Sequence, residues 1–208
     1  MTSIQIPIGS SIGHRVAIRL RQVLIGIALL GTCLFCALAQ DAHSHPGGPT
    51  REWERKSDPG ALIKIVRDST ERFKDVKAAE AEGYGLSFGC VSGPDSGAMG
   101  LHYVNGNLLS RGELDPTHPQ IVIYEPQGDG SLRLIGADFL VFADAWDKKK
   151  QGPPELMGQL FHYFETPNRF GLPAFYTLHV WAWKDNPNGA FVNWHPNVSC
   201  KHFSGTPQ

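Results

Sequence analysis

The sequence predicts an α+β fold, in which one N-terminal amphipathic helix, or two shorter ones, precedes a mainly antiparallel sheet of about five to six strands. Three observations support this class. Apolar residues first recur at helical spacing and then, beyond Gly83, fall in short runs bounded by turn residues. The chain contains 23 glycines and 15 prolines without a collagen-like repeat, which favours many turns over a helical bundle. Hydrophobic residues make up 41% and charged residues 19%, a composition typical of globular proteins.

The first forty residues have the layout of an export signal. Positive residues within 14–21 precede an uncharged run, residues 23–39, and Ala37 and Ala39 are the small residues that a signal peptidase reads. This layout predicts a signal peptide over residues 1–39, cleaved after Ala39, and a secreted or periplasmic protein. After cleavage we expect no stable membrane insertion. A retained anchor is the alternative, because about 17 apolar residues approach the lower limit for crossing a bilayer.

Beyond the signal we predict a flexible leader, residues 40–57, and a single globular domain, residues 58–208. The leader is polar, contains glycine and proline, and has no periodicity. Cys90 and Cys200 are the cysteines that remain, an even number in an oxidising compartment, so we predict that they form a disulfide bond. Two buried free thiols are the alternative. The net charge of −1 argues against a nucleic-acid partner, and the oligomeric state is unknown at this level.

The elements of the domain follow in order. After Asp58, apolar residues at helical spacing predict an amphipathic helix that ends at Gly83, with a break near Asp68 that would divide it in two. Turn residues predict one hairpin between the third and fourth strands and a second between the last two. A glycine-rich loop is expected over 93–100 and a surface loop over 144–154. The expected strands are residues 84–91, 101–104, 120–125, 132–141, 174–183 and 190–194.

Strand periodicity predicts where a pocket lies. Alternate residues of the segment 174–183 share a face, so His179 stands among large or polar neighbours, opposite a more aliphatic face. Such a face is typical of a pocket wall, so we expect an aromatic-lined pocket for a small-molecule ligand. Its predicted lining residues are Tyr103, Phe175, Trp181 and Trp183.

Three polar residues are the candidate metal ligands. His179 is the first of them. His102 follows Gly97 and Gly100, whose missing side chains would let the backbone approach a ligand closely. Glu125 ends an apolar strand, where a carboxylate needs a cation, a metal or a hydrogen-bonding partner. Two imidazoles and a carboxylate form a common ligand set for zinc or another first-row divalent ion, so the sequence predicts one divalent metal at these residues.

Two alternatives to the metal site stay open: a structural polar network, and a metal-free pocket in a non-catalytic, envelope-associated protein that binds a small molecule or a carbohydrate. His162 and His195 could complete or replace the ligand set, although we expect both to be exposed. Three aspartates, Asp138, Asp144 and Asp147, lack the spacing of a calcium loop. The sequence has no nucleophile elbow, phosphate loop or dinucleotide fingerprint, which leaves enzymatic activity uncertain.

Four sequence blocks resemble a family of uncharacterised secreted, mainly bacterial proteins. They are GAMGLHYVN (97–105), IVIYEP (121–126), LHVWAWKDNPNGAF (178–191) and WHPNVSC (194–200). Members of that family carry similar M-G-x-H-Y-V, Y-E-P and L-H-V-W-x-W-K-x-N-P-x-G blocks. The resemblance spans residues 61–200 and implies a secreted single domain, with His102, Glu125 and His179 as the matching polar positions between Cys90 and Cys200. It implies no reaction, and the family pattern has Asn in place of His195.

Overall fold

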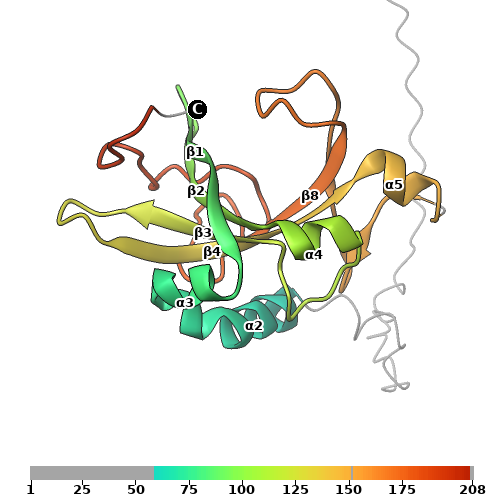
Figure 1. The fold of residues 1–208 in the computed structure, drawn as a ribbon, viewed down its shortest axis with the longest axis horizontal. Coiled ribbons are helices and arrows are strands. Elements are labelled where there is room, and N and C mark those ends of the chain that lie inside the picture. Colours follow the sequence, from blue (N-terminus) through green and yellow to red (C-terminus); the bar gives the residue numbers. More distant parts are fainter. Residues whose placement is uncertain (1–58, 151, 207–208) are drawn as a thin grey trace, which may run out of the picture. The chain divides into compact units, whose positions relative to one another are not determined.

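A six-stranded antiparallel sheet forms the centre of the structure (Figure 1). The computed structural model describes residues 59–150 and 152–206, so the predicted signal and leader lie outside the described residues. Every neighbouring pair of strands runs antiparallel, and the predicted α+β class with a mainly antiparallel sheet is confirmed. In spatial order the strands are β1 (Tyr84–Gly93), β2 (Gly97–Asn105), β3 (Ile121–Pro126), β4 (Leu132–Phe142), β8 (Phe175–Val180) and β7 (His162–Phe164).

The helical segment before the sheet is divided, as the alternative reading of its pattern allowed. Its parts are α2 (Pro59–Thr70), a 3-10 turn η1 (Glu71–Lys74) and α3 (Val76–Ala81). The break falls a few residues after Asp68, because Asp75 starts a new helix by accepting a hydrogen bond from the backbone of Lys77. Three shorter pieces complete the fold: α4 (Gly106–Arg111), α5 (Ala143–Asp147) and a two-stranded ribbon of β5 (Glu155–Leu156) and β6 (Gln159–Leu160).

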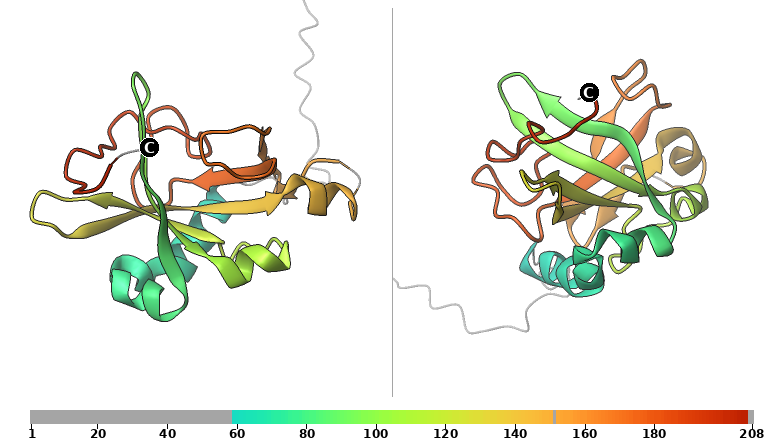
Figure 2. Two further views of the ribbon diagram at one scale, coloured as in Figure 1. Left: turned by 45° about the horizontal axis from the view of Figure 1, so that its top comes forward. Right: turned by 60° about the vertical axis from the view of Figure 1, so that its left-hand side comes forward.

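The two faces of the sheet have different coverings. Helices α2 and α3 lie against one face, whereas loops from the C-terminal part of the chain cross the other (Figure 2). On the helical face, Leu62 and Val66 of α2 belong to one buried cluster with Phe139 of β4 and Leu178 of β8. Because side chains alternate along a strand, the residues that flank Phe139 and Leu178 point toward the loop-covered face.

The second predicted hairpin does not form. Strand β8 ends at Val180, and residues 190–194 belong to no strand, although a turn does lie between them, with Gly189 donating to the carbonyl of Asn186. The physical reason lies in the backbone that follows β8. Trp181 donates to the carbonyl of Ala190, but Ala182 then donates back to the carbonyl of Val180 and Trp183 donates to that of Ile135 in β4, so this arm does not continue alongside residues 190–194.

Two predicted loops are partly regular structure. Strand β2 begins inside the expected glycine loop, at Gly97, and α5 begins the expected surface loop after β4. A side chain at Gly97 would place its Cβ 2.2 Å from the carbonyl oxygen of His195, and one at Gly100 would place it 2.6 Å from that of Tyr124. Glycine is therefore needed at both positions because the backbone of another segment packs closely against it. The expectation that these glycines face a ligand is wrong.

Cys90 and Cys200 form a disulfide bond, as the sequence predicted. The bond ties β1 to the C-terminal segment, which also pairs with β2 through a bridge between Ala98 and His195. Within the described residues, no helix has the length and apolar character that a bilayer crossing requires.

Candidate metal site

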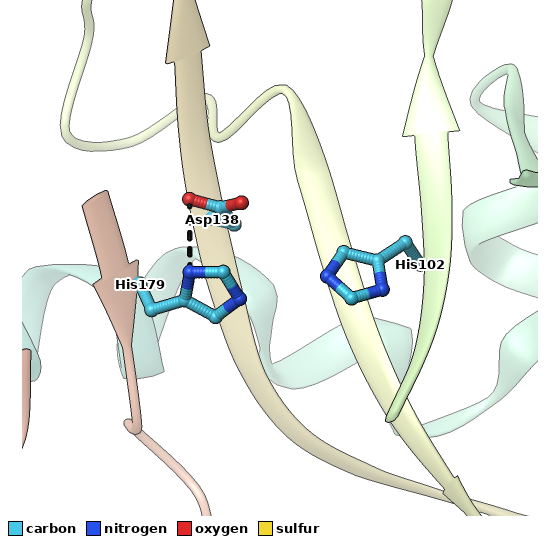
Figure 3. Close-up of side chains that lie close together, drawn as sticks. All are labelled: His102, Asp138 and His179. Atoms are coloured by element: carbon cyan, nitrogen blue, oxygen red, sulfur yellow. Dashed lines mark ion pairs between the residues drawn. The ribbon is translucent and has the colours of Figure 1, made fainter. Parts of the chain in front are cut away.

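Two histidines and an aspartate from three strands converge on the loop-covered face of the sheet (Figure 3). The strand register explains why they meet. Asp138 of β4 lies opposite His179 of β8 and, on its other side, opposite Ile121 of β3. His102 of β2 lies opposite Ile123, two residues farther along β3. One potential ligand atom from each of the three residues lies within 4.8 Å of the others.

The three side chains are buried and only partly hydrogen-bonded. The exposed fractions of His102, Asp138 and His179 are 5%, 2% and 3%. The Nδ1 atom of His102 lies 3.2 Å from the carbonyl oxygen of Gly100, which can only accept, so Nδ1 carries the proton. The other ring nitrogen, Nε2, points toward His179 (Figure 3). Asp138 accepts a 2.6 Å hydrogen bond from the hydroxyl of Thr177.

His179 is the residue whose polar atoms lack partners. Its Nδ1 lies 3.6 Å from a carboxylate oxygen of Asp138, which exceeds hydrogen-bonding distance. Neither of its ring nitrogens has a well-formed hydrogen bond among the described residues, and the same holds for the buried amide oxygen of Asn193. The Asn193 side chain nevertheless lies close enough to His179 to raise the pKa of the ring, against the larger effect of burial. A buried polar group without a partner has a free-energy cost, so this position requires an explanation.

Burial sets the charge state of the cluster. It lowers the pKa of His102 to about 4 and that of His179 to about 3, because a charged imidazolium is poorly solvated there. Burial also raises the pKa of Asp138 to about 6, despite the hydrogen bond from Thr177. Near neutral pH the cluster therefore offers two uncharged imidazoles and one ionised carboxylate. Among the described residues, no lysine or arginine forms an ion pair with Asp138.

A small cavity of about 30 Å³ adjoins the cluster, enough for an ion or a molecule of the size of water. Its polar lining consists of the three cluster residues and Thr177. The rest of the wall is apolar: Phe88, Met99, Ile121, Leu140, Phe164, Phe170, Leu172 and Phe175.

Glu125, the carboxylate predicted from the sequence, does not join the two histidines. Its oxygens accept hydrogen bonds from Lys184 at 2.8 and 2.9 Å and from Arg133. Burial opposes the charge, yet these two cations hold the pKa of Glu125 below its ordinary value. The strand places Glu125 two residues beyond Ile123, toward the turn between β3 and β4. There it forms a salt-bridge cluster, and its assignment as a metal ligand is corrected.

The predicted aromatic wall is only partly present. Phe175 lines the cavity. Tyr103 follows His102 in a strand and therefore points to the opposite face, where its ring contacts that of Tyr124 at 5.0 Å. Trp183 lies beyond the end of β8, so strand alternation no longer applies to it, and its indole donates to Thr70 of α2.

Trp181 is adjacent to the cluster but outside the cavity wall. Its ring lies 5.9 Å from that of His179, and its indole nitrogen donates to the carbonyl of Val192. Of the four predicted wall residues, Phe175 alone lines the cavity. The other apolar residues of the wall are mainly phenylalanines and aliphatic residues that the sequence did not single out.

The two additional histidines have separate roles. His195 is 0% exposed, so the expectation that it is exposed is wrong. Its Nε2 donates to the carbonyl of Asp185, and its Nδ1 accepts from the backbone of Asn197, so neither nitrogen is free for a metal. His162 is exposed as expected, with its Nε2 donating to the carbonyl of Phe191.

Asp138 is the functional candidate that sequence reasoning missed. It was grouped with Asp144 and Asp147 and set aside for lacking calcium-loop spacing. The available signal was its position in the middle of the apolar strand LRLIGADFLV. A carboxylate there is more completely desolvated than one at a strand end, and it needs a partner more.

Comparisons of the chain with protein-family models, with curated proteins and with solved structures find no match.

Acid is expected to destabilise the metal-free domain through the two buried imidazoles. Their pKa values of about 4 and about 3 lie below the ordinary 6.5, so the unfolded chain binds more protons than the folded one as the pH falls from 6.5 to 4. Between pH 6 and 3.8 the folded state binds an extra proton at Asp138, because burial raises the pKa of this residue to about 6. This one proton offsets only one of the two that the unfolded chain gains at the histidines. Urea midpoints at pH 7 and pH 5 measure the effect. The double variant His102→Gln/His179→Gln should lose less stability between these pH values, and an equal loss would contradict this account.

Proposed function

We propose that this domain binds one divalent first-row metal ion through His102, Asp138 and His179, and that it does so as part of an exported protein. The observation that carries the proposal is the His179 ring, which is buried with neither nitrogen in a hydrogen bond and lies beside Asp138, a carboxylate without a cationic partner among the described residues. A metal ion would supply the missing partner to both groups at once. The amide of Asn193, which lies close enough to raise the pKa of His179, can pair with only one ring nitrogen, so a purely structural polar network would leave the other nitrogen without a partner.

The surroundings of the other two ligands support the same conclusion. Ligating histidines usually donate their second ring nitrogen to a carbonyl or carboxylate, which fixes the ring and leaves the other lone pair for the metal. His102 does this through Gly100. Thr177 similarly donates to one oxygen of Asp138, and the backbone of Leu178 also donates to this carboxylate, so the side chain is held in place on the cavity wall. In a tetrahedral zinc site, ligand atoms lie ~3.4 Å apart, so small side-chain rotations would close the present arrangement on an ion.

Two imidazoles and one carboxylate leave coordination positions open, and here these positions face the cavity. A metal ion with open positions can polarise a bound ligand or lower the pKa of bound water. The alternative of a carbohydrate site has less support. Apart from the three proposed ligands and Thr177, the cavity wall has no polar side chain among the described residues for the hydroxyls of a sugar, and Trp181 and Trp183 do not line it.

Export is supported by the disulfide between Cys90 and Cys200, because such bonds persist mainly in oxidising compartments. The N-terminal signal pattern and the resemblance to secreted proteins agree with this assignment. We accordingly propose a secreted or periplasmic protein whose partner is a small molecule at the metal rather than a nucleic acid.

Metal analysis of protein purified without a histidine tag tests the proposal. After incubation with Zn²⁺ and removal of excess ion, we expect about one zinc per wild-type chain, as found in mononuclear sites. His179→Ala should lose the ion, whereas His162→Ala, which removes an exposed histidine outside the cluster, should keep it. Circular dichroism checks that each variant is folded. Negligible zinc in folded wild-type protein, or equal zinc in wild type and His179→Ala, would overturn the proposal.

A further inference from the structure

The wall of the cavity beside the metal site is almost entirely apolar. Apart from the three proposed ligands, Thr177 is the one polar residue in the described part of the chain that lines the cavity. Its hydroxyl already donates a hydrogen bond to Asp138. No lysine or arginine of the described residues lines it. A molecule bound there would therefore find contacts for hydrocarbon on every side except at the metal.

Charge balance restricts the atom that reaches the metal. A divalent ion with one carboxylate and two neutral imidazoles retains a single positive charge. In an apolar cavity that charge lacks solvent and needs a counter-charge. A ligand with one negative charge neutralises the site. A neutral ligand leaves the positive charge uncompensated. A dianion such as phosphate brings one negative charge too many, and no described lysine or arginine lines the cavity to pair with it.

The phenylalanines form a cluster that connects the cavity with the surface. Phe170 lies in the segment between β7 and β8, and its ring is 5.7 Å from Phe88, 6.2 Å from Phe164 and 6.0 Å from Phe175. Phe88, Phe164 and Phe170 are each partly exposed while also lining the cavity. Side chains in this position can contact the part of a ligand that extends beyond the small inner space.

Phe88 is held in this cluster by unusual backbone. Its φ of 65° lies in the left-handed region, which side chains other than glycine rarely adopt, and Gly89 follows with a φ of 62°. The two residues form an irregularity in the pairing of β1 with β2, between Ser87 and Cys90. Bulges of this kind redirect a side chain and occur frequently beside functional sites.

From these observations we infer that the ligand of the proposed metal site is a small amphipathic monoanion: one negatively charged donor group on the metal, and a short hydrocarbon chain among Phe88, Phe164 and Phe170. Carboxylates and thiolates with an unbranched apolar chain have this chemistry. The inference rests on the proposed function, because without the metal the cavity offers such an anion no positive charge.

Titration of Co²⁺-loaded wild-type protein tests the ligand class. The visible d–d absorption of Co²⁺ reports metal binding by itself and changes again when a ligand coordinates. The probes are acetate, propionate, butyrate and hexanoate at constant ionic strength, with 1-butanol and inorganic phosphate for comparison. We expect affinity to rise about three- to fourfold per methylene up to butyrate, the factor that burial of one methylene provides. Butanol and phosphate should bind at least about tenfold more weakly than butyrate, a difference of one uncompensated charge interaction.

Two phenylalanine variants locate the hydrocarbon chain. In Phe170→Ala the gain in affinity per methylene should fall, because the chain loses an apolar surface. Phe191→Ala should keep the wild-type gain, because Phe191 is also partly buried but packs against the cluster that includes Leu62 and Val66. The slope across the carboxylate series is compared within each variant, so a change in metal affinity does not affect the result.

The outcomes separate the two claims. If Co²⁺ binds but affinity is flat along the series, or butanol or phosphate binds as tightly as butyrate, the ligand class is wrong and the metal site stands. An unchanged slope in Phe170→Ala contradicts the placement of the hydrocarbon chain. If folded wild-type protein binds no Co²⁺, the metal site and the ligand inference both fail.

Discussion

Asp138→Asn is expected to lower the affinity of the domain for Zn²⁺ at least about 100-fold, whereas Glu125→Gln should change it by less than about threefold. Loss of a group that merely orients a ligand already costs about 10- to 100-fold, so loss of the ligand itself should cost more. The two carboxylates differ in their surroundings. Asp138 has no cationic side chain as a partner among the described residues, while Glu125 is held by Lys184 and Arg133.

Competition with a chromophoric chelator at pH 7.5 measures both affinities. This pH keeps Asp138 ionised, since its pKa is about 6. Glu125→Gln serves as a stringent control because it removes a buried charge from the same sheet and should reduce stability by leaving Lys184 without its anionic partner. A larger loss of zinc affinity in Glu125→Gln than in Asp138→Asn would mean that the assignment of the carboxylate ligand is wrong.

Removal of the disulfide by Cys90→Ser/Cys200→Ser is expected to lower the free energy of unfolding by about 2–5 kcal/mol. The bond joins residues 110 positions apart, so it restricts a large part of the unfolded chain. In the folded state it anchors the C-terminal segment, whose Val198 is buried in the same cluster as Cys90 and Leu101.

Urea denaturation of the wild type and the double variant gives the difference directly. Wild-type protein treated with a reductant should match the variant. The three proposed ligands all precede residue 180 and lie on β2, β4 and β8, so the folded variant should bind zinc with an affinity close to that of the wild type. A destabilisation below about 1 kcal/mol would contradict the expected role of the bond, because native disulfides in small secreted domains typically contribute more.

Local patterns predicted much of the sheet but little of the way its strands meet. Turn residues between β3 and β4 gave the correct hairpin, and alternation along β8 correctly placed Phe175, Thr177 and His179 on one face. Which carboxylate stands beside His179 depends on the register between β4 and β8. A single sequence does not encode that register in any short-range pattern, so the mid-strand position of Asp138 indicates a carboxylate that needs a partner, but not that the partner is His179.

Other errors had avoidable physical causes. Tyr103 follows His102 directly in a strand, so alternation alone excludes it from the pocket that His102 faces. The hairpin predicted for residues 190–194 failed for a different reason. The backbone after β8 bonds to Val180 and to Ile135 of β4 instead of continuing beside residues 190–194, and no short-range sequence pattern marks these contacts.

The position of β8 between β4 and β7 has a consequence for damaged copies of the protein. If a protease cut the exposed segment after Glu165, the disulfide between Cys90 and Cys200 would still hold the downstream piece, and only its reduction would let that piece detach. Strand β4 would then expose a row of unpaired backbone amides and carbonyls. Such an edge recruits strands from other molecules. Cleavage followed by reduction would thus remove one proposed metal ligand and create an aggregation surface together, so molecules that are nicked and reduced should precipitate, whereas nicked molecules with an intact disulfide should stay soluble.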